Sequence, residues 1–329
     1  MPADRPGPLV SVVTPVYNGE EHLPECVQSV LAQTWPDFEY TIVNNCSTDR
    51  TREIAEEFAA RDNRIRVHNN VEFLDVVSSI NKAFTLISPD STYCKLVAAD
   101  DWLFPRCIEE MVKLAQQHPS VGMVTSYVLS GSRVTWDGLP YGSAVMDGRE
   151  ICRKRFLDSL KIFGGPSASM IRSGILRTQV PFYRVGNYSG DNEAYLELLK
   201  HNDFGFVHQV LSYRRLGEAS RTTSYLRRVR SYPIADIEEV LHFGEHYLSE
   251  QEYSRLIRRK LRSYYRFLAQ AIFDFEKKEF WDYHLQKMSD LKIPISYTRL
   301  GWHVALKLLD LAFNPKRTLE SAYQKLVQR

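Results

Sequence analysis

The sequence predicts an α/β fold in which a mostly parallel sheet carries helices on both faces and a helical C-terminal region follows. Over residues 1–128, short apolar runs rich in β-branched residues alternate with amphipathic segments. From residue 225 onward the apolar spacing is helical almost throughout. The 329-residue chain is 44% apolar and 25% charged, as in ordinary globular proteins, so it can bury a core for such a fold.

The predicted strands of the first region are apolar runs without polar alternation, which is typical of buried parallel strands. These runs cover residues 10–16, 38–43, 65–67, 93–98 and 121–128. Apolar residues at helical spacing predict a helix that begins near Pro24, with further helices around 54–59, 76–87 and 108–115.

Residues 129–224 follow a looser pattern, with clusters of Gly, Pro, Ser and aromatic residues, one predicted helix at 191–201 and one strand at 205–213. Helices are then predicted near 234–248, 250–275, 297–313 and 316–328. We therefore divide the chain into residues 1–128 and 129–224, the two halves of one α/β domain, and a helical tail at 225–329.

The tail is basic, although the net charge of the whole chain is only +2. Residues 225–329 carry 19 Lys or Arg against 13 Asp or Glu. Residues 301–313 are apolar on most of the helix circumference, with Lys307, Lys316 and Arg317 nearby. Such a helix can lie on an anionic membrane surface, or it can pack on the rest of the chain or in a homodimer. The sequence leaves these alternatives open.

The five cysteines favour a reduced compartment, because their number is odd and no pair has metal-ligand spacing. The first eight residues lack the basic and apolar run of a signal peptide, and no run of about 18 apolar residues could span a membrane. We expect a cytoplasmic location.

Polar residues follow three of the predicted strands. They are Tyr17-Asn18, Asn44-Asn45 and Asp100-Asp101, and the carboxyl ends of parallel strands share one edge of a sheet, where ligands bind. Two adjacent carboxylates after a buried strand repel each other, and a hard cation such as Mg²⁺ or Mn²⁺ would offset that repulsion. The alternative is that Asp100 or Asp101 caps the helix after Pro105.

Several other nucleotide and metal motifs are absent. The chain has no GxGxxG after its first strand, no GxxxxGK[ST] and no HExxH. A dinucleotide oxidoreductase, a P-loop nucleotidase and a zinc hydrolase of these types are therefore disfavoured.

Three motifs occur in order: PLVSVVTPVYNGEEHL, FEYTIVNNCSTDRT and LVAADDWLFP. Together they resemble the nucleotide-binding half of the family-2 inverting glycosyltransferases, whose Rossmann-like fold is called GT-A. The resemblance covers residues 1–128 well and about 160–220 more loosely, and it does not extend to the tail. It implies a metal-dependent enzyme that transfers a sugar, with inversion, from a nucleotide diphosphate to an acceptor hydroxyl.

The resemblance also implies partners and a setting. The donor would be a nucleotide-diphosphate sugar, with a UDP-sugar favoured, and the acceptor a carbohydrate or lipid-linked saccharide. The setting would be bacterial cell-surface polysaccharide or glycolipid synthesis. If the basic tail is the part that docks to a membrane, the cytoplasmic enzyme would be peripheral at the inner face of that membrane. Nucleic acid is not an expected partner.

The family's roles are carried onto matching residues. Pro15, Val16 and Tyr17 would line the base pocket, and Asn44 or Asn45 would face the base. The metal, Mn²⁺ or Mg²⁺, would be held by Asp100, with Asp101 beside it at the sugar or the metal. The catalytic base would be Asp191, with Glu193 in reserve, although an Asp at that place can also be a helix N-cap.

Three further segments match the family more loosely. Asn81 falls where the family often has an Asn, but a helix-packing role is equally compatible with its position. Arg214 or Arg215 would approach the diphosphate or support the base loop, and residues 164–169 would lie near the acceptor or form an ordinary turn.

Two departures from the family pattern stand out. Asn44-Asn45 replaces an aspartate-bearing motif, and Ala98 replaces the first Asp of an Asp-x-Asp-Asp motif. They motivate an alternative, in which the chain is a degenerate, non-catalytic nucleotide-sugar-binding subunit of a glycosyltransferase complex. A nucleotidyltransferase is a weaker alternative, since residues 9–35 contain neither Lys nor Arg and only Gly19.

Overall fold

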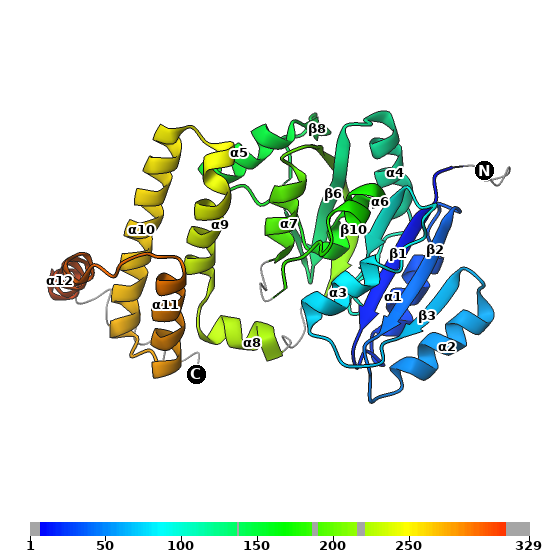
Figure 1. Ribbon diagram of the computed structural model, residues 1–329, viewed down its shortest axis with the longest axis horizontal. Helices are drawn as coiled ribbons and strands as arrows, with labels where there is room; N and C mark the ends of the chain where they lie inside the picture. The colour runs from blue at the N-terminus through cyan, green and yellow to red at the C-terminus, as the bar shows by residue number, and fades with distance from the viewer. Residues whose placement is uncertain (1–6, 137, 186–189, 216–220, 314–329) are drawn as a thin grey trace. The chain divides into compact units, whose positions relative to one another are not determined.

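The computed structural model describes residues 7–136, 138–185, 190–215 and 221–313. They belong to two compact units, Met1–Gly217 and Glu218–Arg329 (Figure 1). The unit boundary lies a few residues before the predicted start of the tail at 225, and the predicted helix at 316–328 lies outside the described residues. The predicted halves 1–128 and 129–224 contribute to one sheet, and their separation stays a prediction.

The sheet of the first unit has the strand order β3-β2-β1-β4-β9-β6-β10-β5. Its parallel half consists of β1 (Val10–Val16), β2 (Phe38–Asn44), β3 (Ile65–Asn69) and β4 (Tyr93–Leu96). The short strand β9 (Met170–Arg172) runs antiparallel between β4 and β6 (Val121–Ser130). Next come β10 (Asp203–Arg214), parallel to β6, and β5 (Trp102–Leu103), antiparallel to β10. Two further short strands, β7 (Arg133–Thr135) and β8 (Val145–Met146), pair with β6 and β10.

Helices cover both faces of this sheet, as predicted. Val10, Val12 and Val16 of β1 share one hydrophobic core with residues of α1 (Leu23–Leu31), α2 (Thr51–Arg61) and α4 (Cys107–Gln117). The helix α3 (Val76–Phe84) packs on β1 and β2 from the other face, and its buried residues take no part in that core (Figure 1). The remaining helices of the unit are α5 (Gly148–Asp158), η1 (Pro166–Ala168), α6 (Ser173–Thr178) and α7 (Gly190–Leu198).

The second unit is helical within the residues that the structure describes. Its helices are α8 (Arg221–Arg228), α9 (Tyr232–Tyr247), α10 (Glu250–Phe273), α11 (Lys278–Asp290) and α12 (Tyr297–Phe313). Ile234, Tyr264, Leu268 and Phe280 lie in their shared core. A capping box between Ser249 and Glu252 fixes the start of α10, because each side chain binds the other residue's backbone N–H.

Within the described part of the chain, no helix is both long and apolar enough to cross a bilayer.

Candidate functional site

The predicted meeting of polar strand ends is confirmed. The strand β1 lies between β2 and β4, with Val16 opposite Asn44 and Val13 opposite Leu96. The segments after Val16, Asn44 and Leu96 therefore leave the sheet at one edge. Tyr17, Asn45 and Asp100 belong to these segments.

The loops after β1 and β2 are joined by hydrogen bonds. Asn18, whose φ is 50°, accepts a hydrogen bond from the backbone N–H of Thr48 at 2.8 Å through its Oδ1. Its own N–H donates to Ser47 Oγ at 3.0 Å, and the N–H of Gly19 donates to Thr51 Oγ1 at 2.7 Å. Asparagine tolerates this left-handed conformation better than most residues. The two loops thus form one rim beside β1.

Asn44 and Asn45 are buried, and their amides bind other parts of the protein. The Nδ2 of Asn45 donates to the carbonyl of Leu74 at 2.8 Å, and the N–H of Leu74 donates back to Asn45 Oδ1 at 3.0 Å. Asn44 donates to Asn69 Oδ1 at 2.8 Å. An aspartate could not donate to the Leu74 carbonyl, since an ionised carboxylate only accepts. This gives a structural reason for asparagine at position 45, while contact of either side chain with a base stays a prediction.

The loop held by Asn45 carries an aromatic residue that sequence analysis missed. Phe73 packs edge-on against Tyr17, with 4.9 Å between the ring centroids and 69° between the planes. Both are largely solvent-exposed, Tyr17 at 49% and Phe73 at 61%. Two exposed aromatic rings at the ligand-binding edge of the sheet offer a surface on which a planar base can stack. Of the other predicted base-pocket residues, Pro15 is half-buried, and the side chain of Val16 belongs to the core.

Asp100 and Asp101 differ sharply in environment. Asp100 is exposed, whereas Asp101 is only 6% exposed. Burial, opposed by a hydrogen bond from Ser167 and reinforced by the charge of Asp100, raises the pKa of Asp101 to about 6. The cap alternative is wrong, because α4 has Arg106 at its N-cap and no side chain caps it.

These carboxylates suit a hard cation. The pair offers only oxygen ligands, and burial disfavours the negative charge of Asp101 in spite of the hydrogen bond from Ser167. A bound Mg²⁺ or Mn²⁺ would compensate that charge. The residues present therefore fit the metal that the sequence analysis implied.

Two arginines, Arg214 at the end of β10 and Arg215 just after it, lie near the same aspartates. The strand end is fixed by pairing with β5, where Tyr213 stacks on Trp102 with 4.9 Å between centroids and 18° between planes. The N–H of Arg215 donates to Asp101 Oδ1 at 3.2 Å, and its Nε donates to the carbonyl of Asp100 at 3.3 Å. The charge of Arg214 also acts to lower the pKa of Asp101. Both arginines thus lie near the place that an anionic diphosphate beside Asp100 would occupy, and the guanidinium of Arg215 also pairs with Glu25.

A buried lysine holds the segment η1 in place through hydrogen bonds. Lys95 of β4 is 0% exposed, and its ammonium group donates to the carbonyls of Ser167 and, at 3.1 Å, Ser169. Ser167 in turn accepts from the N–H of Ala98 at 2.9 Å and donates to Asp101. Lys95 therefore positions the hydroxyl group that supports the buried carboxylate.

The other end of the same segment reaches α7, which carries Asp191. Ser169 Oγ lies 2.9 Å from the hydroxyl of Tyr195, a buried residue of α7. Burial, together with the negative charge of Asp191, raises the pKa of Tyr195 above its usual range. Asp191 lies in the first turn of α7, and its Oδ1 accepts from the N–H of Asn192 at 2.9 Å. Residues 167–169 thus connect the neighbourhood of Asp101 to that of Asp191.

Glu193, the reserve candidate, is paired differently. Its carboxylate forms an ion pair with Arg184 at 3.0 Å, and its side chain is 12% exposed. The choice of Asp191 over Glu193 as the base stays a prediction.

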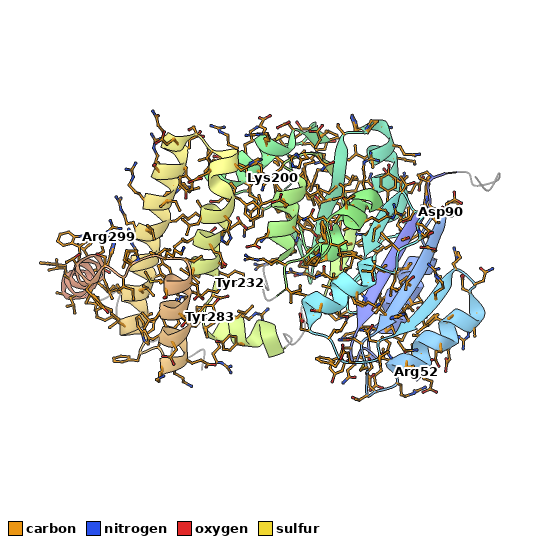
Figure 2. The ribbon with its side chains drawn as sticks, viewed as in Figure 1. Arg52, Asp90, Lys200, Tyr232, Tyr283 and Arg299 are labelled. Atoms are coloured by element: carbon orange, nitrogen blue, oxygen red, sulfur yellow. The ribbon has the colours of Figure 1, made fainter. Side chains whose placement is uncertain are left out.

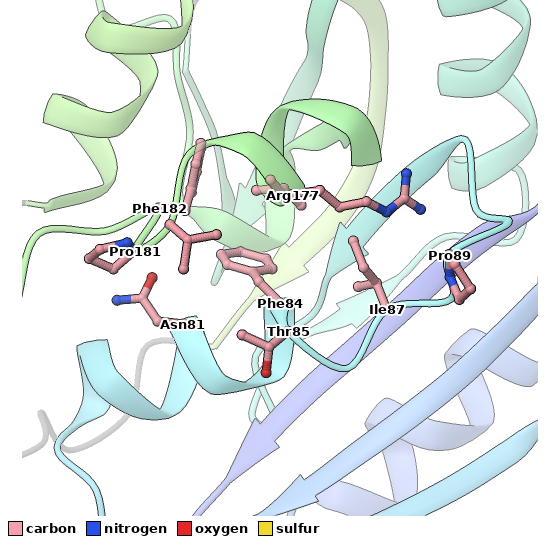
Figure 3. A pocket seen from close by; sticks show the side chains of 10 residues that line it. Asn81, Phe84, Thr85, Ile87, Pro89, Arg177, Pro181 and Phe182 are labelled. Atoms are coloured by element: carbon pink, nitrogen blue, oxygen red, sulfur yellow. The ribbon is translucent and has the colours of Figure 1, made fainter.

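Asn81 has the packing role that the sequence left open. Its amide donates to the carbonyl of Tyr183 at 2.7 Å and accepts from the N–H of Tyr183 at 2.9 Å. It also borders a cavity of about 320 Å³ lined by Phe84, Pro181 and Phe182 (Figure 3). Residues 84–89 of that lining lead into the amino end of β4, whereas Asp100 follows its carboxyl end. The cavity is therefore separate from the carboxylate site.

Comparison with known proteins now gives the chain a family. The sequence model described as Glycosyl transferase family 2 matches residues 11–178, slightly more than half of the chain. A curated relative is the putative teichuronic acid biosynthesis glycosyltransferase TuaG of Bacillus subtilis. It is 27% identical over 240 residues, which span 72% of this chain and 90% of TuaG.

Solved structures share the fold. S. aureus TarS 1-349 in complex with UDP-GlcNAc has a TM-score of 0.64 at 16% identity, covering 96% of this chain and 91% of that one. The mannosyltransferase PcManGT from Pyrobaculum calidifontis, in complex with GDP-Man and Mn²⁺, has a TM-score of 0.55 at 13% identity, covering 97% and 84%. The predicted GT-A fold is confirmed. With the strand-end residues Tyr17 to Asp101 inside the matched region, the chain belongs to glycosyl transferase family 2.

Proposed function

We propose that this protein is a metal-dependent inverting glycosyltransferase that moves a sugar from a nucleotide diphosphate to an acceptor hydroxyl. One observation carries the proposal. A single segment, residues 167–169, joins the buried Asp101 of the Asp100-Asp101 pair to the α7 neighbourhood of Asp191. The first group suits a diphosphate-bound cation, and Asp191 suits a proton acceptor.

The donor would occupy the edge beyond β1, β2 and β4. Its base would stack on Tyr17 and Phe73, and its diphosphate would lie toward Asp100 and the arginines at the end of β10. The structures of TarS with UDP-GlcNAc and of PcManGT with GDP-Man support a nucleotide-sugar donor, and we favour a UDP-sugar.

In the reaction, the bond from the anomeric carbon to the diphosphate oxygen breaks as the acceptor oxygen bonds to the opposite face of that carbon. A Mn²⁺ or Mg²⁺ held by Asp100, with Asp101 beside it, would offset the charge that develops on the departing nucleoside diphosphate. Asp191 takes the proton of the acceptor hydroxyl. General-base help of this kind accelerates transfer by about 10²–10⁴-fold. Arg214 and Arg215 add positive charge near the leaving group.

The acceptor would be a carbohydrate or a lipid-linked saccharide. The relationship to TuaG, named for teichuronic acid biosynthesis, supports a role in assembling a bacterial cell-surface polymer. The segment 164–169 would border the acceptor, since it lies between the two carboxylate sites.

A thermal-shift panel tests the donor and metal together. UDP-, GDP- and dTDP-sugars are added to the purified chain with Mn²⁺ or with EDTA, and we expect stabilisation by one base class only when the metal is present. Asp100→Ala should abolish that metal-dependent shift. Unchanged stabilisation in Asp100→Ala would place the metal elsewhere.

The base is tested by a matched pair of variants. Asp191→Asn should keep the donor-induced shift and lose transfer by about 10²–10⁴-fold, whereas Glu193→Gln should retain most of it. The reverse pattern would assign the base to Glu193.

The replacement of an expected aspartate by Ala98 keeps a second candidate, the non-catalytic nucleotide-sugar-binding subunit. Such a protein would bind the donor but hydrolyse none of it. Slow donor hydrolysis by the purified chain, absent in Asp100→Ala, would exclude this candidate.

A further inference from the structure

The second unit contains a pocket whose charged lining is cationic. It lies between α10 and α12 and has a volume of about 650 Å³. Arg258, Arg262 and Arg266 contribute from one face of α10, at four-residue spacing, and Arg299 contributes from α12. Figure 2 marks Arg299 at the start of α12. Within the described part of the chain, no Asp or Glu lines this pocket.

These four arginines lack counterions among the described residues, since none of them forms an ion pair there. Some other cations of the same unit do form ion pairs, for example Lys260 with Asp236 and Arg230 with Asp274 at 3.1 Å. Unpaired like charges gathered in one pocket repel each other, and an anionic ligand would relieve that repulsion. The neighbouring His303 reflects the same field, because burial and the charges of Arg266 and Arg262 lower its pKa.

An exposed apolar stripe borders the same pocket. Trp302, Leu306, Leu309 and Phe313 recur at helical spacing along α12, and all four are exposed, Trp302 at 65% and Phe313 at 80%. Trp302 and Leu306 also line the arginine pocket, so the stripe and the cationic cluster form one continuous surface. A contiguous apolar surface of this kind marks an interaction site.

We propose that this surface of α10 and α12 docks to an anionic phospholipid membrane. The pocket would take phosphate headgroups, because arginine guanidinium groups bind phosphate through paired N–H donors. The stripe would enter the boundary between headgroups and acyl chains, where Trp is favoured and amphipathic helices lie flat.

The positive charge and the apolar stripe of this surface together favour a membrane over other binding partners. Nucleic acid would suit the arginines, but it would leave Leu306, Leu309 and Phe313 in water. A second copy docked through the same face would bring two arginine clusters toward each other, since a twofold interface uses one patch twice. A membrane with anionic lipids matches both parts of the surface.

Flotation of the full-length chain with liposomes tests the proposal. We expect the protein to float with vesicles of phosphatidylcholine mixed with phosphatidylglycerol, to stay unbound with pure phosphatidylcholine, and to be released by high salt. Each basic residue near an anionic surface strengthens binding by roughly fivefold. The triple variant Arg258→Gln, Arg262→Gln, Arg266→Gln should therefore bind on the order of 100-fold more weakly.

The matched control removes the same charge elsewhere. Arg52, Arg61 and Arg106 are exposed on the first unit, with Arg52 on α2 (Figure 2), and their replacement by Gln should leave flotation nearly unchanged. If both triple variants lost flotation equally, net charge alone would explain the binding, and the assignment of the headgroup site to the arginine pocket would be overturned.

The stripe is tested separately. Trp302→Ser with Leu309→Ser should weaken flotation without lowering the melting temperature, because both side chains are exposed. Sedimentation of the same variants tests self-association. A wild-type dimer that this pair of changes dissociates, or equal binding to neutral and anionic vesicles, would overturn the membrane proposal.

Discussion

Replacing Lys95 by Met removes the ammonium group beneath η1 and keeps most of the side-chain volume. The carbonyls of Ser167 and Ser169 then lose a charged donor in a buried place. Each such loss costs about 1–3 kcal/mol. Burial lowers the pKa of Lys95, because the buried ammonium charge is poorly solvated. Removing this charge recovers part of its desolvation free energy, which offsets some of the lost hydrogen bonding. We expect a net destabilisation of about 2 kcal/mol, or about 4–8 °C in the melting temperature.

The effect on transfer should exceed the effect on folding. Lys95 holds the segment whose hydroxyls reach Asp101 and Tyr195, and a displacement of 1 Å near reacting groups can cost about 10²-fold in rate. We expect kcat for sugar transfer to fall by that order, with a smaller change in KM. Calorimetry gives the melting temperature, and release of nucleoside diphosphate gives the rate.

A surface lysine provides the control. Lys113→Met on α4 removes a half-exposed lysine paired with Glu109, and surface pairs contribute about 0–1 kcal/mol. If Lys95→Met were as stable as the wild type or more so, desolvation of the ammonium would outweigh its two hydrogen bonds, and the anchoring role would be refuted. If Lys95→Met lowered the stability but kept full transfer activity, Lys95 would support the fold and have no role in positioning the site.

Two further predictions concern the base platform and the helical unit. Phe73→Ala should weaken nucleotide binding measured by calorimetry by about 1–3 kcal/mol, the range for aromatic–base stacking. Val71→Ala, a change at a fully exposed neighbour in the same loop, should have no effect. Burial lowers the pKa of His284 to about 4, below its ordinary 6.5, so protonation favours the unfolded chain. Stability of the helical unit should therefore be full above pH 6.5 and fall by about 3 kcal/mol as the pH drops to 4. Denaturant titrations should show this loss, and the decline should flatten in His284→Gln.

The local contacts of His284 explain why its neutral form is favoured. Its Nε2 lies 2.8 Å from the carbonyl of Val229, so this nitrogen carries the hydrogen and donates it. Its Nδ1 lies 2.8 Å from the hydroxyl of Tyr264 and accepts from it. The neutral ring thus has a partner for each nitrogen, and a second proton would place a charge where burial and the nearby Arg230 disfavour it.

The parallel half of the sheet was predictable from sequence because its strands are apolar runs that alternate regularly with amphipathic helices and polar turns. The run at β1 agrees with its predicted bounds, and β2 differs by one residue. Elements of two or three residues, such as β5 and β9, carry too little pattern to be recognised. The helix α11 was missed because only three of its residues, Phe280, His284 and Met288, are buried, one of them is a histidine, and charged and polar residues lie between them.

The candidate site likewise contains residues that could be predicted from the sequence and residues that could not. Asp100 and Asp101 stand directly after an apolar strand, so their grouping with the end of β1 could be predicted from chain order. Phe73 and Lys95 could not, because their roles depend on pairings distant in sequence: Phe73 with Tyr17, and Lys95 with Ser167. An exposed aromatic residue in the loop after β3 and a lone lysine in an apolar strand were the only local signals.

The position of β9 bears on how the chain folds during synthesis. This strand fills the space between β4 and β6 although it follows both in the sequence. Until residue 172 has left the ribosome, β4 and β6 cannot be joined, and each presents an open strand edge of the kind that recruits other chains. A truncation near residue 130 would therefore keep β4 with an open edge and leave β6 without its partners β9 and β10, and we expect it to aggregate when expressed alone.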